Sequence, residues 1–434
     1  MLVQITIQLE GREVRLSKTL QGNPAEREEA GHALAREVGR LVNEAALNEA
    51  ARNTQHPCCC GRPMESRGRR ALTVRSLDGA LEIKRTRYRC RTCQRESTPA
   101  DGLLECGRHR LTRPLAKRVC QLATVEHFTR LPQVVFDQHG VTLSHNEIVA
   151  LVHDVGGAID AQRRAEVETW AQSADKHWPA PEVRPRRVYV SCDGIMYCTN
   201  QREPDPQQPD QKRLLWQQMR VGCVYWQDEQ ERWHKQMLWG REDAQAFGAS
   251  LYRLACRCGY REAAERLFVA DGGEWCWSIH QAYFADARGI LDWYHASQHV
   301  WDTARVLFPD DAAALRRWVD HALTLLHDQG GCELLNWLLT ERTGWRRKKR
   351  ESISQLINYI QPRLDRTAYP TYRAHGWQIG SGMMESTAKQ LVGLRLKGPG
   401  MHWSEAGALA VTALRATDLN GRWHTHWNTL TLNA

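Results

Sequence analysis

The spacing of apolar residues changes near residue 187, and this change constrains the fold more than any other feature. Val188, Val190 and Cys192 occupy every second position, which is the period of a β-strand. The segments expected to follow are strands near 214–226 and 231–239, a helix at about 242–258, the strand RLFVAD, a helix over 274–284 and the strand RGILDWYH. Strands and helices mixed in this way predict an α/β core.

Three strands, a helix, a strand, a helix and a strand form the order of a ribonuclease-H-like core. The segments before and after this core have helical spacing, and a chain of 434 residues is too long for one ordinary domain. We therefore predict a multidomain α/β protein. Its expected parts are a strand pair and helix (1–55), a zinc ribbon (56–100), a helical domain with a helix-turn-helix (101–176), the first part of the ribonuclease-H-like core (186–298), an all-helical insertion (299–375) and the C-terminal helices of the core (376–434).

The net charge of +9, with a pI near 8.9, favours a polyanionic partner. The N-terminal segment MLVQITIQLEGREVRL alternates like a strand pair around Glu10–Gly11 and has no signal-peptide pattern, and no apolar run is long enough to cross a membrane. These features predict a cytoplasmic protein in which clustered cysteines are metal ligands or buried thiols.

Three acidic residues occupy positions suited to magnesium-dependent phosphodiester chemistry. Asp193 lies in the first strand of the predicted core, Asp271 follows the fourth strand, and Glu385 lies on a helix beyond the insertion. If the first and fourth strands are neighbours, both aspartates meet at one edge and the helix delivers the glutamate. Carboxylates are the ligands that magnesium prefers, and two such ions support phosphoryl transfer. A single buried aspartate at a strand end is usually a cap or an ion-pair partner, but three in this order are more specific.

Asp292 and His295, at the end of the fifth strand, are either a structural pair or residues that support the metal site without binding metal; we favour the supporting role. Lys389 lies one helical turn after Glu385 and either pairs with that carboxylate or contacts a phosphate. Both alternatives remain open from the residues alone.

A cysteine-rich segment predicts a structural zinc site. The second ligand pair, Cys90 and Cys93, has the C-x-x-C spacing of a zinc knuckle. The first pair lies within CCCG and has irregular spacing: Cys58 or Cys59 with Cys60, of which we assign Cys58 and Cys60. Free buried thiols are the alternative to zinc.

Two basic segments are candidates for contact with DNA phosphates, although a solvated surface is the simpler explanation for each. The strand beside the cysteines carries Arg85, Arg87 and Arg89, and the predicted insertion carries a run that includes Arg346, Arg347, Lys348 and Lys349. A helix that ends near His139–Gly140, followed by a helix capped by Ser144, predicts a helix-turn-helix. Such pairs occur in many helical domains, and we favour DNA binding here.

The motifs CDG, ADGGEW, DWYH and IGSGMMESTAKQLVGLRLKGPGMHWS together resemble those of bacterial insertion-sequence transposases of the ISKra type, within the DDE superfamily. The DWYH segment is similar to the D-x-x-H element of Mutator- and hAT-like transposases. The resemblance covers roughly residues 56–420. It implies a catalytic triad of Asp193, Asp271 and Glu385 with Asp292 and His295 as accessory residues, and strand transfer on element ends. The irregular CCCG motif is the point of departure.

We therefore expect a DNA transposase that uses two magnesium ions and a structural zinc, binds double-stranded DNA at inverted repeats and target, and acts as a homo-oligomer at the bacterial nucleoid. The alternatives are a DNA-binding regulator whose catalytic fold is idle and a nuclease without strand transfer. The repeat sequence, target preference, oligomer number and pathway (cut-and-paste or copy-out, with or without a hairpin intermediate) do not follow from the sequence.

Overall fold

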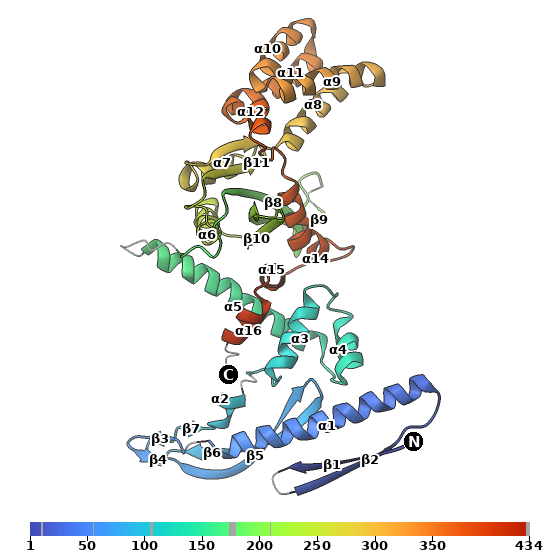
Figure 1. Cartoon of the computed structure of the whole chain (residues 1–434), viewed down its shortest axis with the longest axis vertical. Coiled ribbons are helices and arrows are strands. Elements are labelled where there is room, and N and C mark those ends of the chain that lie inside the picture. The colour runs from blue at the N-terminus through green and yellow to red at the C-terminus, as the bar shows by residue number, and fades with distance from the viewer. Residues whose placement is uncertain (10–11, 55, 105–106, 173–178, 209, 431–434) are drawn as a thin grey trace. The chain divides into compact units, whose positions relative to one another are not determined.

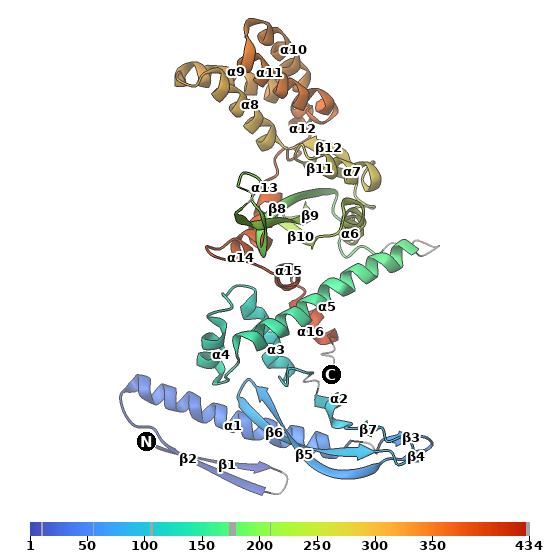
Figure 2. The same ribbon diagram turned by 180° about the vertical axis from the view of Figure 1, so that it is seen from behind.

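The structure is a computed structural model that describes residues 1–9, 12–54, 56–104, 107–172, 179–208 and 210–430 (Figures 1 and 2). The chain forms two compact units. The first comprises residues 1–157 and 421–434, and the second comprises residues 158–420. Each unit mixes helices with strands.

The first unit begins with the predicted strand pair and helix. Strands β1 (Leu2–Leu9) and β2 (Arg12–Thr19) pair antiparallel, and the predicted turn at Glu10–Gly11 lies outside the described residues. Helix α1 (Pro24–Arg52) starts at a capping box, because Asn23 accepts the Glu26 N–H and Glu26 accepts the Asn23 N–H.

A three-stranded sheet packs against α1. It contains β5 (Glu65–Ser76), β6 (Gly79–Arg89) and β7 (Glu96–Ser97), with the short pair β3 (Cys58–Cys59) and β4 (Arg62–Pro63) and helix α2 (Ala100–Leu104) beside it in sequence. The core between sheet and helix contains Ala51, Val74, Leu81, Ile83 and Ala100. Burial of these apolar side chains stabilises the packing of α1 on the sheet that follows the cysteine segment.

Three helices follow: α3 (Arg113–Ala123), α4 (Leu131–His139) and α5 (His145–Gln172). Helix α4 ends at Gly140, whose left-handed φ of 64° suits a glycine, and Ser144 caps α5 by accepting the Glu147 N–H at 3.2 Å. The predicted helix boundaries on both sides of this turn are confirmed. Helix α16 (Trp423–Thr429) completes the unit.

The second unit is built on a five-stranded sheet in the order β10-β9-β8-β11-β12. The strands are β8 (Arg187–Pro204), β9 (Lys212–Gln227), β10 (Trp233–Gly240), β11 (Glu265–Ala270) and β12 (Arg288–Leu291). The first three pair antiparallel, whereas β11 runs parallel to both β8 and β12. The predicted adjacency of the first and fourth strands is therefore confirmed.

Helices cover both faces of this sheet. Helices α6 (Ala244–Arg257) and α7 (Glu274–Tyr283) lie on one face, where the Cys276 thiol of α7 contacts the Cys192 carbonyl of β8. Helix α13 (Gly382–Ala388) packs on β8 and β9, with Met384 against Cys223. Cys223 pairs with Ser191, so both side chains point to the face that α13 covers. Because side chains alternate along a strand, Asp193 lies on the same face as Ser191.

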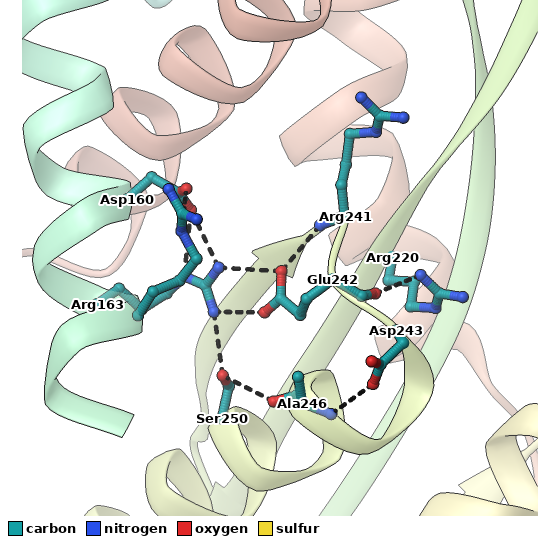
Figure 3. A network of polar contacts seen from close by, with 9 residues as sticks. Asp160, Arg163, Arg220, Arg241, Glu242, Asp243, Ala246 and Ser250 are labelled. Carbon is teal, nitrogen blue, oxygen red and sulfur yellow. Dashed lines mark hydrogen bonds and ion pairs between the residues drawn. The ribbon is translucent and has the colours of Figure 1, made fainter. Parts of the chain in front are cut away.

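A buried ion network joins the C-terminal half of α5 to α6 and to the connection between β10 and α6 (Figure 3). The Arg163 guanidinium donates to Glu242 at 2.7 Å, to Asp160 at 3.0 Å and to the Ser250 hydroxyl at 3.1 Å. Because its side chain is only 11% exposed, Arg163 is a fixed cross-link and not a surface ion pair. Part of the predicted linker at 177–187, namely residues 177 and 178, lies outside the described residues.

Between β12 and α13 the chain is helical, as predicted. The helices are α8 (Trp293–Leu307), α9 (Ala312–Asp328), α10 (Gly331–Glu341), α11 (Arg347–Ile360) and α12 (Tyr369–Ala374), with 3₁₀ turns η1 (Arg342–Gly344) and η2 (Gln361–Arg366) on either side of α11. After α13 come the π-helix η3 (Lys389–Gly393), α14 (Leu394–Leu396) and α15 (Glu405–Leu419). Among the described helices, none has the length and apolar character required to cross a membrane.

Candidate functional site

Asp193 and Asp271 lie at the same level of two neighbouring strands. Val269 pairs with Ser191 in the parallel β8–β11 ladder, and two residues further along each strand are Asp271 and Asp193. In the β11–β12 ladder, Ala270 pairs with Leu291, so Asp292 follows at the same level. Three aspartates therefore lie at one level across three adjacent parallel strands: Asp271 and Asp292 directly follow the carboxyl ends of β11 and β12, and Asp193 lies beside them within the longer β8. The carboxyl ends of strands are where open α/β sheets bind ligands.

The two predicted metal ligands on the sheet are fixed by local hydrogen bonds. Asp193 accepts the Gly194 N–H at 2.6 Å, and Asp271 accepts the Gly273 N–H at 2.9 Å. Burial raises the pKa of Asp193, and the nearby charge of Asp271 raises it further. Carboxylates that are crowded together and partly withdrawn from water are stabilised in their charged form by a bound cation.

Asp292 is fully buried and joins three segments of the chain. One carboxylate oxygen accepts hydrogen bonds from the His295 backbone N–H at 3.0 Å and from the His295 ring at Nδ1, at 2.5 Å. The other oxygen accepts a hydrogen bond from the Ser381 N–H at 2.6 Å. The hydrogen bond to Asp292 raises the pKa of His295. Asp292 thus caps α8 and fixes the segment that leads into α13.

Glu385 lies on α13 and is exposed. The Ser381 hydroxyl donates to its carboxylate at 3.3 Å, so a two-step chain of hydrogen bonds connects Glu385 to Asp292. Among the described residues, the carboxylates of Asp193, Asp271 and Glu385 do not all lie within 4.8 Å of one another. A pair of metal ions about 3.5–4 Å apart has ligands spread over a wider site than a single ion does.

Lys389 begins the π-helix one turn after Glu385, and its side chain is exposed. Within the described part of the chain, no ion pair joins it to Glu385, so the structure does not select the pairing alternative. Short π-helical segments are often found at functional sites.

The loop after Asp271 is held by the helical segment between β12 and α13, a contact that sequence reasoning did not predict. Arg363 donates to the Gly272 carbonyl at 2.7 Å and lies 4.6 Å from the ring centroid of Tyr359. A Cβ added at Gly272 would meet the Tyr359 ring at 2.4 Å, and that ring stacks on His299 at 3.7 Å. The sequence signal for this contact was only a glycine pair after the aspartate and a tyrosine–arginine pair with i,i+4 spacing.

The second site is a cluster of four cysteines: Cys59, Cys60, Cys90 and Cys93. Their sulfur atoms all lie within 4.8 Å of one another, and Cys59 lies 3.3 Å from Cys93 and 3.8 Å from Cys60. Tetrahedral zinc with Zn–S bonds of about 2.3 Å places its sulfurs roughly 3.8 Å apart. The donor set and its spacing therefore fit a structural zinc ion.

Of the predicted zinc ligands, the structure brings Cys60, Cys90 and Cys93 together, and Cys59 takes the place assigned to Cys58 in the cluster. Cys58 and Cys59 are consecutive residues of β3, so their side chains point to opposite sides, and Cys58 is exposed. Cys59 packs toward Met64, Tyr88 and Cys90.

The thiols of the cluster differ in acidity. Hydrogen bonds from the backbone of the second knuckle, first from Cys93, lower the pKa of Cys90 to about 6. The hydrogen bond with Cys93 is the main cause that raises the pKa of Cys59, to about 12. Zinc binds thiolates, so metal binding at this cluster releases protons.

The predicted DNA-contact residues lie in different surroundings. Arg85 and Arg87 on β6 form ion pairs with Asp101 and Glu96. Arg89 ends β6 and is half-buried. The basic run of Arg346, Arg347, Lys348 and Lys349 opens α11, with Lys349 over the Trp345 ring at 5.0 Å. Cations at the start of a helix are repelled by the positive end of the helix dipole. An anion bound at that end would offset this repulsion.

No known protein family and no curated protein matches the chain. Among solved structures, a Drosophila P element transposase strand transfer complex is similar with a TM-score of 0.25 and 9% sequence identity, over 74% of this chain and 81% of that chain. A likeness at this TM-score does not establish a shared fold.

Proposed function

We propose that this protein is a DDE-type DNA transposase with a ribonuclease-H-like core. The observation that carries the proposal is the alignment of Asp193 and Asp271 on neighbouring parallel strands, with Asp292 linking that edge to the helix of Glu385. Strand order and the placement of α13 on the Asp193 face support the same assignment.

Asp193, Asp271 and Glu385 would hold two magnesium ions, which supply an activated attacking oxygen and stabilise the leaving oxygen. The protein's own residues arrange this site. Asp292 and His295 hold the start of α8 and the Ser381 segment in place, and Arg363 holds the loop that follows Asp271. Fixing the carboxylates before DNA binds reduces the reorganisation needed in the transition state.

The remaining regions would bind DNA. We assign the inverted repeats to the zinc ribbon and the helix-turn-helix, which belong to the first unit, and the flanking phosphates to Lys389, the α11 basic run and the β6 arginines. Arg85 and Arg87 would exchange their acidic partners for phosphates. A homo-oligomer would pair two element ends in the bacterial cytoplasm.

The test is an end-cleavage and strand-transfer assay on DNA that carries the inverted repeats flanking the coding region. Wild type should cut and join in magnesium, and Glu385→Gln should lose activity by at least about 10²-fold. Glu262→Gln, at an exposed glutamate away from the site, is the matched control and should match wild type.

Equal cutting by wild type and Glu385→Gln would remove Glu385 from the mechanism. Binding without metal-dependent cleavage would identify a regulator with an idle core. Nicked products without joined products, when donor and target are mixed, would identify a nuclease.

A further inference from the structure

A pocket lies beyond the acidic edge, where β8 and β9 extend as a hairpin. It has a volume of about 240 Å³, and its lining includes Cys198, Leu214, Trp216, Leu396, Lys397 and His402. The segment between α14 and α15 forms one wall, and the β8–β9 hairpin forms the other. This pocket has no part in the function proposed above.

The wall formed by residues 396–403 is fixed to the hairpin by Trp403. The Trp403 N–H donates to the Cys198 carbonyl at 3.1 Å, the Asn200 N–H donates to the Trp403 carbonyl at 3.0 Å, and the indole N–H donates to the Leu396 carbonyl at 3.1 Å. The buried Arg395 guanidinium lies 4.9 Å from the Trp403 ring. The pocket is therefore built by ordered backbone and is not an incidental gap between mobile loops.

The lining combines an open aromatic surface with positive charge. Trp216 is 51% exposed, although the inner wall beside it is apolar and Leu396 is fully buried. Lys397 and His402 are exposed at the rim, and within the described residues neither has an acidic partner. An exposed aromatic ring beside the unneutralised Lys397 ammonium matches a ligand with a flat ring and an anionic group.

The pocket lies near the acidic edge along the same strand. Trp216 pairs with Cys198, five residues along β8 from Asp193, which is roughly 17 Å along a strand. That distance corresponds to about five nucleotides of a DNA strand. Because five is an odd number of residues, alternation places the Trp216 side chain on the opposite face of the β8–β9 hairpin from Asp193, so a strand held at the acidic edge would pass round this hairpin to reach the pocket.

We propose that this pocket holds one unpaired nucleotide of the DNA strand, with its base stacked on Trp216 and its phosphate at Lys397. The inference rests on the proposed action on DNA, and it adds a site that distinguishes an unpaired nucleotide from a duplex. Stacking on an aromatic side chain tolerates any base, so the pocket requires an unpaired nucleotide and not a particular sequence.

The test compares binding of a labelled oligothymidylate of about twenty nucleotides with binding of a random-sequence duplex of equal length. The full chain is used without added magnesium, so the readout is independent of cleavage. Trp216→Ala should weaken single-strand binding about five- to hundredfold and change duplex binding less than about twofold, whereas Trp216→Phe should keep most of the affinity. Met196→Ala, at an exposed apolar residue of the neighbouring strand β8 outside the pocket lining, is the matched control and should match wild type.

Two further measurements do not depend on a single variant. Lys397→Gln should reduce the slope of log affinity against log salt for the single strand by about 0.7. A 2-aminopurine base within the oligonucleotide should lose fluorescence on binding wild type and regain it with Trp216→Ala. Equal single-strand affinity of Trp216→Ala and wild type, or an equal loss on single strand and duplex, would overturn the proposal.

These results separate the two proposals. Loss of single-strand binding by Trp216→Ala in a protein that never cleaves DNA would support the pocket and reject the transposase mechanism. Cleavage that depends on Glu385, together with unchanged single-strand binding by Trp216→Ala, would support the transposase mechanism and reject the pocket.

Discussion

The Asp292 carboxylate accepts the backbone N–H of Ser381 at 2.6 Å, across 89 positions of sequence. Because the Ser381 hydroxyl in turn contacts Glu385, one buried side chain sets where the glutamate helix begins. Asp292 therefore couples the stability of the core to the geometry of the candidate site.

Asp292→Ala should destabilise the second unit by about 2–4 kcal/mol, because it removes the cap of α8 and leaves the buried Ser381 N–H without its partner. Asp243→Ala removes only the exposed cap of α6 and should cost about 1 kcal/mol. Urea unfolding of both variants measures the difference. Equal costs would show that the Ser381 contact contributes little.

Gly272→Ala should reduce cleavage, because its Cβ would lie 2.4 Å from the Tyr359 ring and would displace the loop that follows Asp271. Overpacking of this kind costs about 1–3 kcal/mol. Gly382→Ala is the matched control, since a Cβ there meets nothing within 4 Å and lies close to Glu385 in sequence. Tyr359→Ala in the same chain should restore part of the loss, and purely additive effects would argue against the clash.

Arg163→Leu should destabilise the second unit by about 3–5 kcal/mol, because Asp160 and Glu242 lose their buried partner. Arg164 also pairs with Asp160, at 3.0 Å, but its side chain is 55% exposed. Arg164→Leu should therefore cost less than about 1 kcal/mol. Thermal unfolding of the two variants provides the comparison, and similar midpoints would contradict the buried cross-link.

Stability of the first unit should fall at acid pH through Glu147. The hydrogen bond from the Ser144 N–H is the largest cause that lowers the pKa of Glu147, and Arg75 lowers it further. Because the folded-state pKa is below the unfolded value of about 4.3, this stabilisation is present above pH 4.3 and is lost as the pH falls through the folded-state pKa. Wild type should exceed Glu147→Gln in melting temperature at about pH 7, and the difference should shrink as the pH falls below about 4.3. A constant difference would exclude this linkage.

Cys90→Ser should lose the metal, whereas Cys58→Ser should keep one zinc ion per chain, because Cys90 belongs to the four-sulfur cluster and Cys58 does not. Elemental analysis measures the metal content of both proteins. Since zinc binding and folding are coupled, Cys90→Ser should also weaken binding to the element ends while leaving the second unit folded. Metal loss from Cys58→Ser with retention by Cys90→Ser would contradict the cluster.

The strand order and the levels of Asp193 and Asp271 could be predicted because apolar residues at every second position mark a strand and turn residues mark its end. The choice of Cys59 over Cys58 could not, because it depends on where the two-residue strand β3 begins, and a shift of one residue reverses its side chains.

Contacts between distant segments could not be predicted either. The Gly272–Tyr359 packing and the wall around Trp216 each join residues far apart in sequence, and local periodicity carries no information about such pairs. Trp216 itself has nothing in its neighbouring residues that separates it from a core tryptophan.

The two ends of the helical segment from α8 to α12 are held together at its base, where the Trp293 N–H donates to the Ile379 carbonyl at 2.9 Å beside the Asp292–Ser381 bond. Lengthening a loop whose ends are already held together costs little, about 0.6 kcal/mol for each doubling. Insertions in the loops that join α9, α10 and α11 should therefore cost little and leave the start of α13 in place, whereas changes near Tyr359 and Arg363 would reach the loop after Asp271.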